Sequence, residues 1–261
     1  MGNSSFSRAV SAEILKLRST VALKLALIYP IIPVFIYGLI MFYFQEKIAD
    51  NKMNTWAFFI SIVWNFWSSF AFLPLIGLQT ILINNLENAN NGWRNLFSLA
   101  FSRNKIYLAK LLTVIFLILI SLVSLSFYIY LYGIICSVAF PQLNFQNHSI
   151  PLTLFVNPLL VLVGSLAIIC LHYFFSAFVK NVFTCFGATV FVTILGLFLI
   201  QKEDIAIYFP WSWPALSSHS FNNGMNASQL GEKSLALSLL FFLIITVIGL
   251  RNESKWNKIS Q

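Results

Sequence analysis

Side chains able to do acid–base or metal chemistry are few in this sequence and lie far apart. Its long apolar segments contain no Asp or Glu, and His172 is the one titratable group in the middle of such a segment. A lone His in an apolar helix is more often packed and hydrogen-bonded than part of a proton relay. Cys136, Cys170 and Cys185 also lie in apolar segments, without metal-ligand spacing. We therefore expect no catalytic site, no metal site and no bound cofactor.

The sequence also lacks a nucleotide-binding loop. Residues 231–234 read Gly-Glu-Lys-Ser, whereas a P-loop places its Lys directly after a glycine. The position five residues before Gly231, where the motif needs another glycine, is Asn226. HExxH and GxSxG motifs are missing as well. Any ATP-driven activity of this chain would therefore need a separate ATPase subunit.

A polar interruption between two apolar segments runs from residue 86 to residue 110. Apolar residues recur there at three- and four-residue intervals, and charged residues lie between them: Leu86, Trp93, Leu96, Phe97 and Ala100, with Glu87, Arg94, Arg103, Lys105 and Lys110. This pattern predicts a short amphipathic helix, too polar to cross a bilayer. We interpret it as a helix at the inner face of a membrane protein that contacts a cytoplasmic partner. The alternative is an interfacial loop that only joins two spans.

Composition predicts the fold class. Hydrophobic residues make up 59% of the 261 residues and charged residues only 9%, whereas roughly a quarter of a soluble domain is charged. The apolar segments have the length of membrane-spanning helices, about 20 residues. We predict an all-α polytopic membrane protein, one domain over residues 1–261, with six spans at about 21–44, 56–83, 105–138, 153–179, 182–200 and 234–250. Pro30 and Pro33 predict a kink in the first span, and the long second span is expected either to tilt or to break near Pro74.

The basic residues predict the orientation. With the N-terminus inside, the inner segments hold twelve of the 16 Lys and Arg residues: Arg8, Lys16, Arg18, Lys24, Arg94, Arg103, Lys105, Lys110, Lys180, Arg251, Lys255 and Lys258. The outer segments hold Lys47, Lys52, Lys202 and Lys233. Because basic residues concentrate in cytoplasmic loops, both ends of the chain are predicted inside. The same bias explains the net charge of +8 without a nucleic-acid partner.

Two further segments carry candidate functional residues. Residues 4–20 place Phe6, Val10, Ile14 and Leu17 on one helical stripe, with Arg8, Glu13, Lys16 and Arg18 largely off it. This predicts an amphipathic helix at the membrane interface, where Lys and Arg suit anionic headgroups; an ordinary solvated leader is the alternative. The longest polar loop, 201–233, contains Trp211 and Trp213 beside prolines. They are interpreted as interface anchors or, alternatively, as residues involved in substrate release.

Several short motifs, in this order, resemble the permease subunit of an ABC-2 type exporter. Glu13-x-x-Lys16-Leu17-Arg18 resembles the leader of the lantibiotic-protection and bacitracin-resistance group. Glu87, Trp93-Arg94, Leu96, Ser102-Arg103, Lys105, Tyr107 and Lys110-Leu111-Leu112 resemble that group's coupling segment, and Pro210-Trp211-Ser212-x-Pro214 resembles its last outer loop. Many relatives have a proline near Ala100 or Phe101, which this sequence lacks.

The resemblance implies a permease in a bacterial plasma membrane, without an ATPase site of its own. A separate cytoplasmic ABC ATPase would use ATP and Mg, and Glu87, Trp93, Arg94 and Arg103 would contact it. A second permease, identical or different, would complete the path. The substrate would be a hydrophobic or cationic antimicrobial peptide, exported to give lantibiotic immunity or antibiotic resistance. Two other classes stay open: a non-transport sensor or assembly protein, and a gradient-driven carrier.

Overall fold

The computed structural model describes residues 2–18, 20–45, 54–88, 103–179, 181–219 and 225–256. Within these residues the fold is all-α and contains no strand. Six helical stretches are long and apolar enough to cross a membrane: Val21–Tyr43, Thr55–Asn85, Asn104–Ala139, Thr153–Phe178, Val182–Leu199 and Ser228–Arg251. The predicted polytopic all-α protein with six spans is therefore confirmed.

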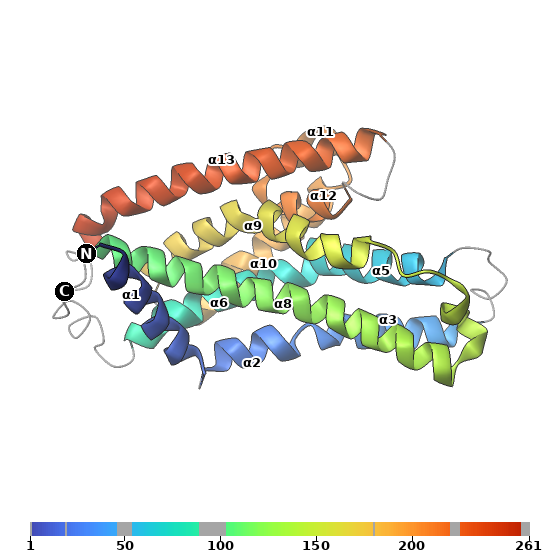
Figure 1. The fold of residues 1–261 in the computed structure, drawn as a ribbon. Helices are drawn as coiled ribbons and strands as arrows, with labels where there is room; N and C mark the ends of the chain where they lie inside the picture. Colours follow the sequence, from blue (N-terminus) through green and yellow to red (C-terminus); the bar gives the residue numbers. More distant parts are fainter. Residues whose placement is uncertain are drawn as a thin grey trace.

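Helix α8, Arg103–Ala139, runs the length of the bundle (Figure 1). It packs against α1 (Gly2–Leu17), α2 (Val21–Ile28), α3 (Ile31–Tyr43), α6 (Phe72–Asn88) and α9 (Thr153–Phe178). The buried apolar positions of α8 recur every three or four residues: Leu111, Val114, Leu117, Ile118, Leu122, Leu125 and Ile129. This spacing keeps one helical stripe of α8 packed against its neighbours in the core.

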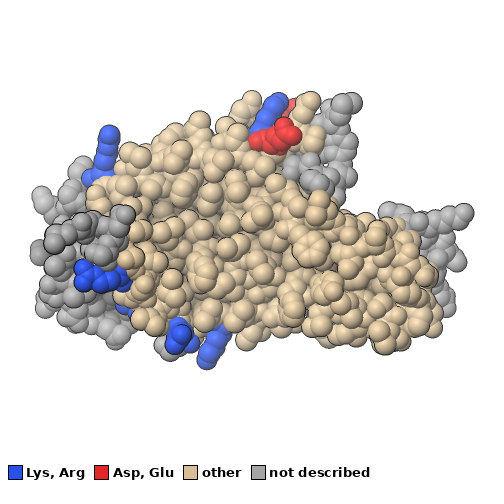
Figure 2. Space-filling model, in the orientation of Figure 1, with Lys and Arg blue, Asp and Glu red and all other residues tan. Residues whose placement is uncertain are grey.

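The start of α1, the start of α8 and the end of α13 (Met225–Trp256) lie at the same end of the bundle (Figure 1). This arrangement fits an even number of membrane crossings. Figure 2 shows Lys and Arg side chains at that end and over the α1–α2 junction, whereas most of the visible surface carries no charge. An uncharged surface of this extent is what the hydrocarbon core of a bilayer requires.

Both predicted irregularities in the first two spans occur, one of them displaced. The first span breaks at Tyr29 and Pro30, between α2 and α3. The second consists of α5 (Thr55–Phe66), a π-helical turn η1 (Trp67–Ala71) and α6. The amide of Phe72 bonds to the carbonyl of Trp67, five residues back. Pro74 lacks an N–H, so the backbone rearranges in the turn before it rather than at the proline itself.

The predicted polar loop 201–233 is largely helical and folds back against the bundle. It forms α11 (Glu203–Ala206), η4 (Pro210–Ser212) and α12 (Trp213–His219), and α12 packs against α9 and α13. Gly164 is near the middle of α9, and a Cβ there would clash with Ser217 of α12. Only a glycine allows this approach. The sixth helix also begins earlier than predicted, at Met225 instead of residue 234.

Gly133→Ala tests the packing of α8 against α5. An added methyl group at Gly133 would overlap the ring of Trp56, which is 3% exposed and donates from Nε1 to the Phe145 carbonyl at 2.9 Å. We expect the free energy of unfolding to fall by about 1–3 kcal/mol, the usual cost of overpacking, measured by denaturant unfolding in detergent. Gly187→Ala is the matched control, because a Cβ there meets nothing within 4 Å. Equal losses in both variants would contradict the packing described.

Candidate functional site

The predicted contact segment lies between the end of α6 and the start of α8. Glu87 belongs to the last turn of α6, and Arg103 is the first residue of α8. Trp93 and Arg94 lie outside the described residues. The two helices therefore lead into and out of the segment, and their contacts determine which parts of the bundle it can move.

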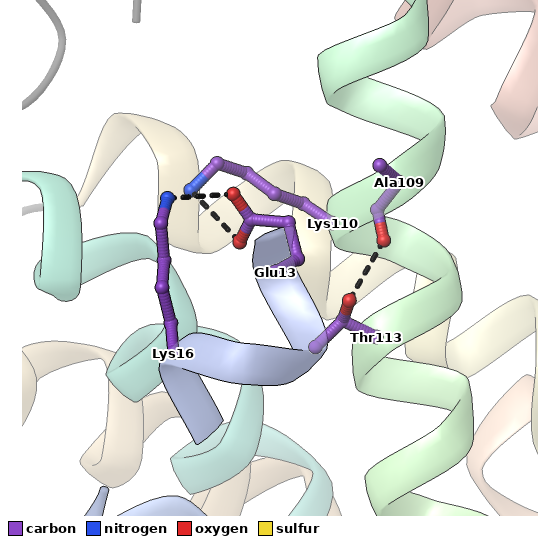
Figure 3. A network of polar contacts seen from close by, with 5 residues as sticks. All are labelled: Glu13, Lys16, Ala109, Lys110 and Thr113. Carbon is purple, nitrogen blue, oxygen red and sulfur yellow. Dashed lines mark hydrogen bonds and ion pairs between the residues drawn. The ribbon is translucent and has the colours of Figure 1, made fainter. Parts of the chain in front are cut away.

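A buried ion-pair network joins α1 to α8 close to this segment (Figure 3). Glu13 is 5% exposed and Lys110 1% exposed. The Lys110 Nζ lies 3.8 Å from Glu13 Oε2, and the Lys16 Nζ lies 2.8 Å from Glu13 Oε1. One carboxylate thus lies between two ammonium groups, about two turns into α8.

The position of Glu13 corrects the prediction that it lies off the packed stripe of α1. The buried residues are Ala9, Glu13 and Leu17, which lie four residues apart on one helical face, whereas Ile14 is 41% exposed. Glu13 therefore faces α8. The sequence pattern assigned it to the polar face because a carboxylate counts as polar in any hydrophobic periodicity. Arg18 follows α1 directly and is exposed.

Burial makes Glu13 and Lys110 depend on each other. Taking a charged group out of water costs several kcal/mol per ion, and an opposite charge nearby recovers much of that cost. Lys16 contributes less, because its side chain is 38% exposed and water competes for its charge. The ion pair therefore fixes which face of α1 docks on α8.

A polar joint between α1 and α2 connects this network to α6. Thr20 caps α2 by accepting a bond from the Leu23 amide at 3.4 Å, and its hydroxyl donates to the Leu17 carbonyl at 2.9 Å. Gln79, which is fully buried in α6, donates from Nε2 to the Ala22 carbonyl of α2 at 2.9 Å. Residues 13–28, which we call the α1–α2 elbow, are thus bonded to α6 through Gln79.

A second polar side chain of α6, Asn84, forms hydrogen bonds to α9. The Nδ2 of Asn84 donates to the Ser176 hydroxyl at 2.6 Å and to the Tyr173 carbonyl at 3.3 Å, both on α9.

Sequence reasoning missed Gln79, Asn84 and the pairing of Lys110 with Glu13. The available signal was their position, because polar side chains inside apolar spans are costly unless they are bonded.

His172, on α9, is hydrogen-bonded at both ring nitrogens. Its Nε2 accepts a bond from Trp211 Nε1 at 3.0 Å, and its Nδ1 lies 3.4 Å from the Thr189 hydroxyl of α10 (Val182–Leu199). Because Nε2 accepts, the proton of a neutral ring belongs on Nδ1, which then donates to Thr189. This geometry matches the packed, hydrogen-bonded interpretation of His172.

Of the two outer-loop tryptophans, Trp213 lies inside the protein and Trp211 is half-buried. Trp213 is 1% exposed, and its Nε1 donates to the Ile207 carbonyl at 2.8 Å. The interpretation of Trp213 as an interface anchor is therefore wrong. Trp211 is half-buried and joins η4 to α9 through His172. Aromatic and proline content favoured an interface, but the donors of both indoles find partners within the bundle.

The fold and the bonded elbow define a polytopic membrane protein whose helices are connected through buried polar groups. The family model described as ABC-2 family transporter protein matches residues 9–196, more than half of the chain. No curated protein and no solved structure matches. The chain therefore belongs to the ABC-2 transporter family and is a membrane-spanning permease of an ABC transporter, a class that works with an ABC ATPase.

Glu13→Gln tests the buried ion pair. It removes the carboxylate that faces the buried Lys110 ammonium, so we expect the free energy of unfolding to fall by about 3–5 kcal/mol. Lys16→Gln, at the exposed partner, should cost only about 0–1 kcal/mol. Both values are measured by denaturant unfolding in detergent. In a double-mutant cycle, Glu13→Gln combined with Lys110→Met should lower the free energy of unfolding by clearly less than the sum of the two single changes. Strictly additive losses would contradict the pairing.

Proposed function

We propose that this permease is the membrane subunit of an ATP-driven exporter and that energy enters through residues 86–103. A separate cytoplasmic ATPase hydrolyses ATP with Mg and contacts the segment through Glu87, Trp93, Arg94 and Arg103. The observation that carries the proposal is the position of this segment. The helices on either side of it are each bonded to the same elbow, α6 through Gln79 and α8 through the Lys110–Glu13 pair.

The proposed mechanism follows from these bonds. A displacement of the contact segment moves the ends of α6 and α8. Because Gln79 and Lys110 are buried, their bonds cannot be exchanged for bonds to water without a cost of about 1–3 kcal/mol or more for each group. The elbow therefore moves with the two helices and passes the displacement to α2 and α3, the first span. Asn84 passes it to α9 on the other side.

The remaining parts of the proposal rest on the motif resemblance together with the family. Both ends of the chain lie in the cytoplasm, as the distribution of basic residues predicts. The substrate is a hydrophobic or cationic antimicrobial peptide of the lantibiotic type, and export protects a bacterial cell. A second permease, identical or different, completes the path. The exposed apolar side chains of α10 and α13, among them Phe191, Phe198 and Leu243, are compatible with a partner subunit or with lipid.

Trp93→Ala combined with Arg94→Glu tests the contact with the ATPase. Trp and Arg are the residue types that most often dominate interfaces, where losing one costs about 2 kcal/mol or more. We expect the amount of ATPase that co-purifies with the tagged permease to fall more than roughly tenfold. Lys202→Glu, at the predicted outer side, reverses a charge elsewhere and should leave co-purification unchanged. Full co-purification with the double variant would show that the ATPase binds elsewhere.

Glu13→Gln with Lys110→Met tests transmission separately from binding. This pair of changes removes the charges of the α1–α8 contact and leaves the contact segment itself intact. We expect the ATPase to remain bound, while the peptide transported per ATP hydrolysed, measured in proteoliposomes, falls severalfold. Gly187→Ala serves as the reference variant. Normal coupling in the double variant would mean that α1 does not take part in energy transfer.

A further inference from the structure

The α1–α2 elbow has a buried face that packs against α6 and an exposed face that points away from it. Its inner face carries Ala22 and Ala26, which are 1% and 0% exposed, and bonds to α6 through the Ala22 carbonyl. Its outer face carries large apolar side chains with high exposure: Leu15 at 62%, Val21 at 60% and Ile28 at 60%. Exposed apolar side chains at this junction of a membrane protein are expected to contact lipid.

Two exposed cations, Arg18 and Lys24, lie within four residues of these apolar side chains in the sequence. Arg18 follows Leu15 by three residues, and Lys24 and Ile28 follow Val21 by three and seven residues. These spacings place Lys24 on the same side of α2 as the two exposed apolar residues. Figure 2 shows basic side chains projecting over the α1–α2 junction.

Neither cation is neutralised within the described part of the chain. Arg18 and Lys24 form no ion pair there, and Glu13, which precedes Arg18 by five residues, is buried and paired with Lys16 and Lys110. The elbow therefore presents two free positive charges with apolar side chains around them. Complementary chemistry is an anionic phosphate attached to a hydrocarbon chain.

We propose that the α1–α2 elbow is a binding site for an anionic phospholipid of the surrounding leaflet. Arg18 and Lys24 bind the phosphate, and Leu15, Val21 and Ile28 contact the start of an acyl chain. The combination favours a lipid over a protein partner, because a soluble protein gains little from cations interspersed with side chains already in the bilayer interface. The proposal goes beyond the general attraction of a basic helix to a membrane, since it assigns one headgroup to two named residues. It does not depend on the proposed export function.

The test uses the full chain, purified in detergent and equilibrated with equal amounts of dioleoyl phosphatidylglycerol and dioleoyl phosphatidylcholine. Native mass spectrometry then counts the lipid molecules of each kind that stay bound. The two lipids share their acyl chains, so only the headgroup charge differs. We expect the wild-type chain to retain phosphatidylglycerol preferentially. Arg18→Gln with Lys24→Gln should lower that preference by roughly fivefold for each cation removed.

Three comparisons make the test decisive. Lys202→Gln with Lys233→Gln removes the same charge elsewhere and should keep the preference. Arg18→Lys with Lys24→Arg keeps both charges and should keep it as well. Arg18→Gln alone changes an exposed side chain, so this variant should fold normally. Its preference for phosphatidylglycerol should fall about fivefold. The proposal is overturned if the wild-type chain shows no preference, if Arg18→Gln retains the full preference, or if the elbow variants lose a co-purifying protein but no lipid.

Discussion

The buried carboxylate of Glu13 determines how the N-terminal helix is arranged. It lies 97 positions before Lys110 in the sequence, yet the two side chains share one desolvated contact between α1 and α8. A helix held only by apolar side chains could rotate or slide, because apolar contacts are not directional. A buried charge pair favours one register, since any other separates the Lys110 ammonium from the Glu13 carboxylate. The rest of the elbow follows from that register.

The sequence predicts those features that depend on local composition. The six spans and the break near Pro30 follow from hydropathy, segment length and backbone chemistry, and each appears in the structure. The π-helical turn was predicted only as a break near Pro74, because the sequence shows where an N–H is missing but not which turn adapts. The number of spans is robust because membrane-spanning length is a strong constraint.

Features that depend on tertiary partners were not predictable in the same way. Glu13 was assigned to the polar face because its partner comes from another helix. Trp213 was assigned to an interface because aromatic and proline residues favour interfaces. Here the segment folds back, and the Ile207 carbonyl accepts a hydrogen bond from the indole N–H of Trp213. Both errors have one origin: a polar group can be buried wherever a partner satisfies it, and the partner is invisible in a local window.

The same buried bonds limit how this bundle can move. α6 is bonded to α2 through Gln79 and to α9 through Asn84, and α8 is bonded to α1 through Lys110. In a low-dielectric interior, polar groups that lose such a bond find no water to bond to instead. We therefore expect bonded helices to move together when one of them is displaced slightly. We propose that energy reaches this permease as a displacement of residues 86–103. Under the proposed function, α1 therefore belongs to the moving part of the protein, because it is bonded to α8 and continues into the first span.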